Sequence, residues 1–117
     1  MDAFEELASR TSQPFCQVTT ALANAEAAQR VATSAVSARL AACAQVSGPV
    51  TSTYWWRGAV ESATEWIVTF KTTVERYPAL EKHLRDEHPY DVPEILCLPI
   101  VAGSPAYLDW VATETRG

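Results

Sequence analysis

The stretch Glu65-Trp66-Ile67-Val68-Thr69-Phe70-Lys71-Thr72-Thr73 is the clearest β-strand pattern in the chain. β-Branched and aromatic residues dominate it, as is typical of strands that are buried in a sheet. Side chains alternate along a strand, so one face carries Trp66, Val68 and Phe70, and the other carries Ile67, Thr69 and Lys71. We therefore expect a β-sheet built around this segment.

The residues before this strand predict its first partner. Ala41 to Val46 begins a strand, Ser47-Gly48-Pro49 interrupts it, and Val50 to Arg57 resumes it. A Ser-Gly-Pro sequence inside a long strand is a signal for a turn or a bulge. Gly58 then marks a turn, so these two strands are predicted to form an antiparallel hairpin.

The remaining segments predict three helices and two more strands. A first strand is expected over Pro14–Thr20, and Asn24 is a candidate N-cap for an alanine-rich helix over Ala25–Leu40. Tyr77, Leu80 and Leu84 mark a second helix, which Pro89 ends. A final strand is expected over Glu94–Val101 and a short last helix over Pro105–Thr113.

This order of elements predicts an α+β fold. Strand, helix, strand, strand, helix, strand is the ferredoxin-like split βαβ arrangement (βαββαβ) with an antiparallel sheet, followed here by a C-terminal helix. A chain of 117 residues fits one domain, which we expect over residues 13–117, with residues 1–12 as an N-terminal tail.

Composition narrows the classes of function. The net charge is −5 and no basic run is present, so a nucleic-acid partner is not expected. No long apolar run or signal peptide is visible, so no membrane span is expected and the predicted location is cytoplasmic. Cys16, Cys43 and Cys97 are an odd number without a CxxC spacing, which favours reduced thiols that behave as small hydrophobes.

The predicted helices cover only one face of the sheet. The strands carry apolar residues on both faces, as where Ile95 and Cys97 alternate with Leu96 and Leu98. A soluble monomer rarely exposes a large apolar patch. We therefore expect a homo-oligomer that buries the second face, without a subunit number from this argument alone.

The connector His88-Pro89-Tyr90-Asp91-Val92-Pro93-Glu94 is rich in groups that bind ligands. It offers an imidazole, a phenol and two carboxylates, and its two prolines restrict the backbone. Two readings are open. The segment is a rigid link between helix and strand, or it is part of a binding site.

Several short motifs, in order along the chain, resemble the CutA family of divalent-cation tolerance proteins. The motifs are Leu40-Ala41-Ala42-Cys43, Ser52-Thr53-Tyr54-Trp55-Trp56-Arg57-Gly58, Lys71-Thr72-Thr73, His88-Pro89-Tyr90, Pro93-Glu94 and Tyr107-Leu108-Asp109-Trp110. The resemblance implies a ferredoxin-like fold, a compact homotrimer, and a role in the response to divalent metal ions with copper or another divalent cation as the bound ion.

Residue by residue, the resemblance places the family's proposed copper ligands at His88, Glu87 and about Thr19. Cys16 lies in the same strand as Thr19 but its side chain is expected on the opposite face. Copper favours imidazole and thiolate, so only His88 is retained as a good donor. The alternative is that His88 makes hydrogen bonds at the end of its helix.

A second function follows from the likeness of this trimer to PII signalling proteins, which bind small molecules between subunits. Lys71, Tyr90, Glu94, Tyr54 and Trp56 are the candidate ligand-binding residues of such a cleft. Lys71 would hold an anion and pair with Glu94, or the two would form a structural ion pair. No GxSxG, HExxH or P-loop motif is present, so the chain is not expected to be an enzyme.

Overall fold

The computed structural model describes residues 14–116, and the predicted tail over residues 1–12 lies outside that range. Seven elements follow one another along this part of the chain. They are β1 (Phe15–Leu22), α2 (Ala25–Ser37), β2 (Cys43–Trp56), β3 (Ala59–Thr73), α3 (Tyr77–Glu87), β4 (Ile95–Pro99) and α4 (Pro105–Glu114).

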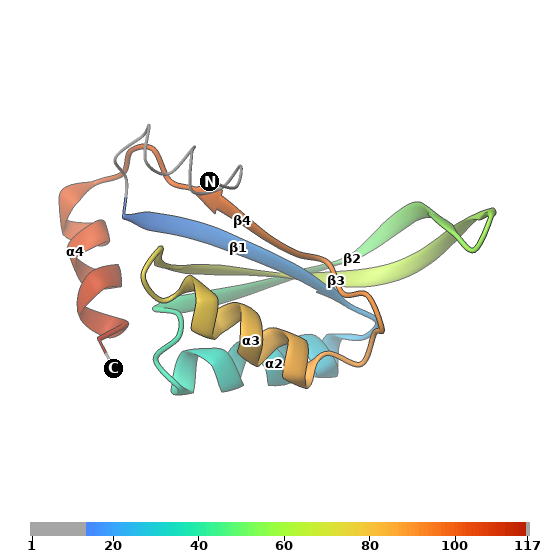
Figure 1. Ribbon diagram of the computed structural model, residues 1–117, viewed down its shortest axis with the longest axis horizontal. Coiled ribbons are helices and arrows are strands. Elements are labelled where there is room, and N and C mark those ends of the chain that lie inside the picture. The colour runs from blue at the N-terminus through green and yellow to red at the C-terminus, as the bar shows by residue number, and fades with distance from the viewer. Residues whose placement is uncertain (1–13, 117) are drawn as a thin grey trace.

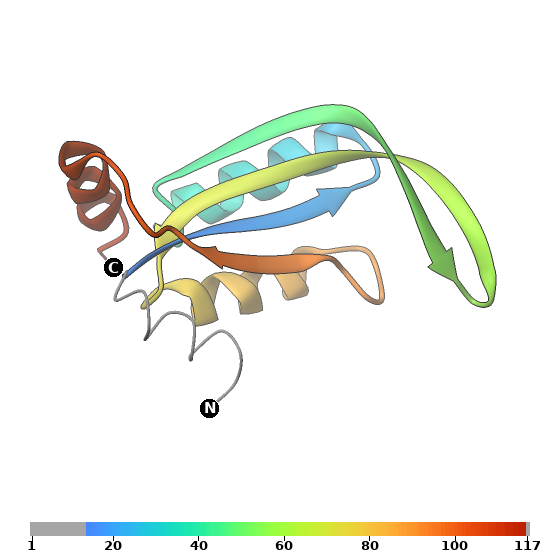
Figure 2. The same ribbon diagram turned by 90° about the horizontal axis from the view of Figure 1, so that it is seen from above.

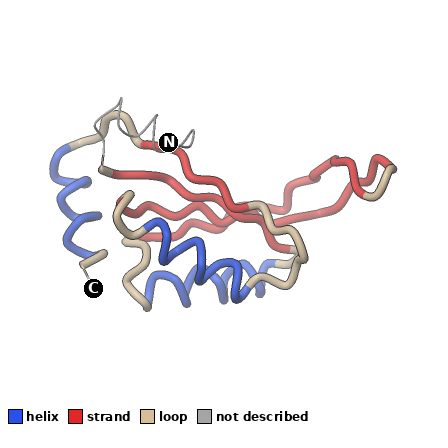
Figure 3. Tube along the Cα trace, viewed as in Figure 1, coloured by secondary structure: helices blue, strands red, loops and turns tan. Residues whose placement is uncertain are grey.

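The strands form one antiparallel sheet in the order β2-β3-β1-β4. The helices α2 and α3 lie side by side against one face of it, and no helix of residues 14–116 covers the other face (Figures 1 and 3). This is the predicted ferredoxin-like arrangement. The prediction of the fold class and of the C-terminal helix is confirmed.

The core lies between the sheet and the two helices. Val18, Val68 and Phe70 point into it from β1 and β3, and all three are fully buried. The inner face of α2 consists largely of alanines, which bring this helix close to the sheet. Asn24 caps α2 as predicted, because its side-chain oxygen accepts a hydrogen bond of 2.7 Å from the Ala27 amide.

The hairpin of β2 and β3 extends beyond the rest of the sheet as a two-stranded arm, which we define as residues 50–65 (Figure 2). The predicted interruption is confirmed, because the register shifts between Ser47 and Val50. The predicted start of β3 at Glu65 was wrong, since the strand begins at Ala59. Its first residues lack hydrophobic alternation and pair by polar contacts, as between Thr53 and Ser62, whose hydroxyls lie 3.0 Å apart.

The open face of the sheet is more polar than predicted. Its central rows across β2, β3, β1 and β4 are Gln45, Thr69, Thr19 and Leu96, and next to them Cys43, Lys71, Gln17 and Leu98. The apolar part of this face is therefore confined mainly to the edge strand, where Leu96 and Leu98 are more than half exposed. The expectation of a broad apolar sheet face needs this correction.

The two ends of the sheet differ. At one end α4 packs through the buried Val111, and Arg39 bonds Glu114 at 2.8 Å. At the other end the arm projects away from the helices (Figure 1). The last strand is shorter than the predicted Glu94–Val101, since pairing ends at Pro99. Within residues 14–116, no helix is long and apolar enough to cross a membrane.

Candidate functional site

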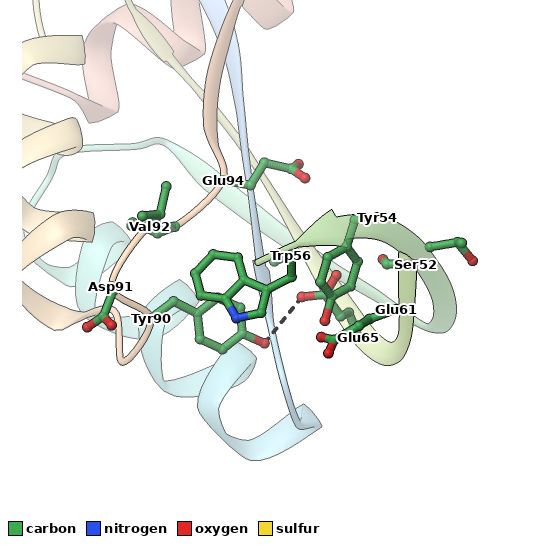
Figure 4. A pocket seen from close by; sticks show the side chains of 12 residues that line it. Ser52, Tyr54, Trp56, Glu61, Glu65, Tyr90, Asp91, Val92 and Glu94 are labelled. Atoms are coloured by element: carbon green, nitrogen blue, oxygen red, sulfur yellow. Dashed lines mark hydrogen bonds between the residues drawn. The ribbon is translucent and has the colours of Figure 1, made fainter. Parts of the chain in front are cut away.

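A pocket of about 750 Å³ lies at the base of the arm. The arm forms one wall and the loop of residues 90–94 forms the other (Figure 4). Ala21 at the end of β1 also lines the pocket. This volume is within the usual range for small-molecule sites, about 300–1,000 Å³. The His88–Glu94 connector is thus part of a cavity wall as well as a link.

Four carboxylates line this pocket, and no lysine or arginine among residues 14–116 does. Glu61 and Glu65 come from the arm, whereas Asp91 and Glu94 come from the loop. In the view of Figure 4 the two glutamates of the arm lie on one side of the Trp56 and Tyr90 rings, and Asp91 lies on the other. Like charges around one cavity produce a negative potential, which attracts cations and repels anions.

Three aromatic side chains complete the lining: Tyr54, Trp56 and Tyr90. The Tyr90 hydroxyl donates a hydrogen bond of 3.2 Å to Glu65 Oε2. Burial raises the pKa of Tyr90 to about 12, and the negative charge of Glu65 adds to this effect. The guanidinium of Arg57 stands 5.4 Å from the centre of the Trp56 ring, so this ring already attracts a cation.

Strand alternation explains which arm residues reach the pocket. Tyr54 and Trp56 are two residues apart and share a face, whereas Trp55 between them points away and is 74% exposed. Tyr54 lies directly opposite Glu61 in the ladder, so the two project on the same side of the arm. The arm therefore presents aromatic and acidic groups on a single face.

The structure brings together four of the five predicted ligand-binding residues. Tyr54, Trp56, Tyr90 and Glu94 all line the pocket, but Lys71 does not. The Lys71 amine donates a hydrogen bond of 2.9 Å to Gln45 on the open sheet face, beside Gln17 of β1. The expected pairing of Lys71 with Glu94 is not formed within the described chain.

The predicted metal ligands His88 and Glu87 bond to different elements. His88 Nε2 lies 2.8 Å from the Ala21 carbonyl, and its Nδ1 accepts a hydrogen bond of 3.2 Å from the Tyr90 amide. Nε2 must therefore carry the ring proton and donate to Ala21. Glu87 instead accepts a 2.8 Å bond from Ser34 on α2, beside His83.

These contacts test whether the family's metal fits the predicted ligands. A histidine needs a free lone pair to bind a metal, and both ring nitrogens of His88 already have a partner. Thr19 lies on the open sheet face, opposite to Cys16. Among residues 14–116, no three His, Cys, Asp or Glu side chains are grouped closely enough to hold a metal. The predicted ligands of one chain do not fit a metal ion as they stand.

Glu61 and Glu65 are the pocket residues that sequence reasoning missed. If the strand had been extended back to Ala59, the period of two would have placed both glutamates on one face of the arm, with Glu61 opposite Tyr54. The segment from Glu61 to Thr64 is polar and lacks hydrophobic alternation, so the sequence did not predict that the strand continues through it.

Comparison with known proteins gives the family. The model of the CutA1 divalent ion tolerance protein family matches residues 16–114. This chain belongs to that family. A chloroplastic CutA protein of Oryza sativa is 39% identical over 106 residues, which cover 91% of this chain but 60% of that relative. A divalent-cation tolerance protein of Pectobacterium atrosepticum is 36% identical, with 91% and 99% covered.

The family fold is equally clear in solved structures. The crystal structure of CutA1 from Oryza sativa has a TM-score of 0.86 and 39% identity, and the match covers 91% of this chain and 97% of that one. A divalent cation tolerance protein from Thermus thermophilus has a TM-score of 0.85 and 37% identity, with 87% and 99% covered. The family and fold expected from the sequence motifs are confirmed.

Proposed function

We propose that this family member is a homotrimeric binding protein, not an enzyme, that acts in the response to divalent metal ions and holds cations in the acidic pocket at the base of the arm. One observation carries the proposal. Four carboxylates line the pocket, and within the described part of the chain no lysine or arginine lines it. The family's association with divalent cations agrees with that charge.

The acidic lining also favours a cationic ligand over an anionic one. A PII-like anion site needs a basic group or a phosphate-binding loop, and Lys71 lies outside the pocket. A cation instead gains from the negative potential of the four carboxylates. No three acidic side chains in residues 14–116 are grouped closely enough to form a full ligand set, so we propose that water or a neighbouring subunit supplies the remaining ligands of a divalent ion. Carboxylate oxygens suit hard divalent ions better than they suit copper, so the pocket favours ions such as Mn²⁺ or Ca²⁺.

Copper binding through His88 and Glu87 needs more than one chain provides. His88 would have to release the Ala21 carbonyl or the Tyr90 amide, and Glu87 would have to release Ser34. Further donors would have to come from neighbouring subunits, because a lone imidazole does not make a tight site. We propose that any copper site of this kind is weaker than the pocket.

The aromatic lining favours a second candidate, an organic cation. Tyr54 and Tyr90 offer ring faces to an ammonium or guanidinium group, and the carboxylates supply the counter-charge. Trp56 also offers its ring face if the ligand replaces Arg57 over that ring. This retains the idea of a small-molecule site between subunits but reverses the charge of its ligand. The pocket volume of about 750 Å³ has room for such a molecule.

Self-association is supported by where the apolar surface lies. Trp55 and Val60 are 74% and 57% exposed on the arm, and Leu96 and Leu98 are 55% and 52% exposed on the edge strand. Exposed apolar groups next to an unpaired strand edge favour contacts with other copies. We propose that arms and edge strands of neighbouring subunits meet in a homotrimer in the cytoplasm.

Isothermal calorimetry with Glu61→Gln tests the proposed site. Mn²⁺ and a small diamine are titrated separately into the wild type and the variant. We expect the variant to lose about fivefold in affinity or more, because one charge near a cation is worth about 1 kcal/mol even in water. The matched control is Glu75→Gln, which removes one charge outside the pocket lining. Equal affinity in the wild type and Glu61→Gln would contradict the proposal.

A further inference from the structure

Two of the three free thiols lie together beneath the sheet, away from the pocket. Cys16 is on β1 and Cys97 is on β4, the strand that pairs with β1 at the sheet edge. Cys97 lies opposite Val18, and Cys16 lies opposite Pro99. The two cysteines are thus diagonal neighbours on the helix-covered face, where Cys16 is fully buried and Cys97 is partly exposed.

The two thiols interact directly. A hydrogen bond from the Cys16 thiol to Cys97, followed by burial, raises the pKa of Cys16. The same bond lowers the pKa of Cys97. Cys16 is therefore the donor, and Cys97 is the thiol that gives up its proton more readily. A thiolate is the form of cysteine that binds metals.

The spacing suits a bridging ion better than a disulfide. Diagonal neighbours on antiparallel strands have Cα atoms about 7–8 Å apart, whereas disulfides need about 4.4–6.8 Å. Two metal–sulfur bonds of about 2.3 Å each hold sulfurs about 4.6 Å apart when they are in line. An ion can therefore join these sulfurs without the movement of the strands that a disulfide requires.

We propose that Cys16 and Cys97 form a two-coordinate bis-thiolate site for a soft, thiophilic metal cation such as Cu⁺ or Ag⁺. Thiolates select soft cations, and no third His, Cys, Asp or Glu in residues 14–116 joins the pair. On binding, both thiols release their protons to solvent as the metal–sulfur bonds form, and no electrons are transferred. The site shares no residue with the acidic pocket or with His88 and Glu87.

Access and charge are compatible with this site. Cys97 is partly exposed on the helix-covered face of β4, so an ion can reach it from beneath the sheet without crossing the strand edge that we propose faces a neighbouring subunit. Two thiolates and one monovalent cation leave a single negative charge. Glu81 acts unfavourably on a charged Cys97, so this charge relies on contact with water at that face. A tetrahedral ion such as Zn²⁺ needs four ligands and should bind poorly here.

Native mass spectrometry under anaerobic, reducing conditions tests the site with Ag⁺, which undergoes no redox reaction with the thiols, and with Cu⁺. We expect one ion per wild-type chain, loss of that ion in Cys16→Ala and Cys97→Ala, and its retention in Cys43→Ala. Glu61→Gln should also retain it, which separates this site from the pocket. Wild-type affinity in both Cys16→Ala and Cys97→Ala would overturn the proposal.

A second measurement needs no variant, since loss of Cys16 from the core could impair folding. Iodoacetamide labelling of the wild type, with and without one equivalent of Ag⁺, reports each thiol by peptide mass. We expect Ag⁺ to protect Cys97 while Cys43, which contacts the Tyr107 hydroxyl at 3.5 Å, stays reactive. Unchanged labelling of Cys97, or protection of Cys43 instead, would refute the site, as would recovery of the pair only as a disulfide.

Discussion

His88 Nε2 donates a 2.8 Å hydrogen bond to the carbonyl of Ala21, and this bond ties the end of α3 to the end of β1. His88 is nearly buried, so the Ala21 carbonyl has little access to water. The ring also packs against Tyr90 at 4.6 Å between centres. The histidine of the predicted metal site thus positions the loop that forms one wall of the pocket.

Replacement of this histidine should therefore cost stability. We expect His88→Ala to lower the free energy of unfolding by about 1–3 kcal/mol, because it leaves a buried carbonyl without its donor. Urea denaturation followed by circular dichroism measures the change. His83→Ala is the control, because His83 bonds Ser34 near the surface and should have a smaller effect. A similar loss for both variants would show that His88 has no special anchoring role.

The aromatic wall predicts a contrast between neighbouring tryptophans. Trp56 lines the pocket and Trp55 points away from it. Trp56→Ala should weaken binding of a small organic cation by about two- to fivefold, the effect of a lost cation–π contact of about 0.5–1 kcal/mol. Isothermal calorimetry with a diamine compares Trp56→Ala with Trp55→Ala under conditions in which both variants have the same oligomeric state. If Trp55→Ala weakened binding as much as Trp56→Ala, the proposed binding face of the arm would be wrong.

The Tyr90 hydroxyl should lose its proton at a higher pH than an ordinary tyrosine does. Its pKa is raised to about 12, above the ordinary value of 10.0 for a tyrosine, so the folded protein retains this proton when the unfolded chain has lost it. Stability from this group is complete below about pH 10 and falls as the pH rises toward 12. Ultraviolet titration at 295 nm of the wild type minus Tyr90→Phe isolates the transition. A midpoint near pH 10 would contradict the burial of this phenol beside the negative charge of Glu65.

Two glycines of β2 and its turn offer a matched pair of substitutions. Both have positive φ, at 151° for Gly48 and 81° for Gly58. A Cβ at Gly48 would lie 2.7 Å from the Trp66 ring, whereas nothing lies within 4 Å at Gly58. Gly58→Ala should cost about 1–2 kcal/mol from backbone strain, and Gly48→Ala about 1–3 kcal/mol more from the clash. Equal losses in urea denaturation would mean that Trp66 moves aside freely.

The arm should control assembly. Trp55 and Val60 are directly opposite each other in the ladder, and both are exposed. We expect Trp55→Ser with Val60→Ser to shift the sedimenting species from trimer toward monomer while the circular dichroism spectrum is retained. The control is Thr53→Ala, a change of a polar residue on the same arm face. A wild-type sedimentation coefficient for the double variant would exclude this surface from the interface.

The fold could be predicted because its signals are local. Alternation in Glu65–Thr73, the cap at Asn24 and the stop at Pro89 each act within a few residues. The pocket could not be predicted in the same way, because its two walls come from segments that are far apart in the sequence. Its arm glutamates lie in a polar segment that reads as a loop, and only pairing with β2 makes it a strand.

The ion-pair and hydrogen-bond partners of individual side chains also could not be predicted from the sequence. Lys71 and Glu94 have opposite charges, but Lys71 pairs with Gln17 of β1, and the β4 residue in the same row is Leu98, four residues after Glu94. The bonds of His88 to Ala21 and Tyr90 likewise depend on how the helix end meets the sheet. Residue types suggested a site in each case, and only tertiary geometry determined which groups meet.

An anomalous difference map from crystals soaked in Mn²⁺ tests the central claim most directly. The acidic pocket predicts a peak between the arm and the loop, within reach of the carboxylates of Glu61, Glu65 or Glu94. Peaks found only elsewhere, with this pocket empty in every subunit, would contradict the proposal that the chain holds divalent cations there.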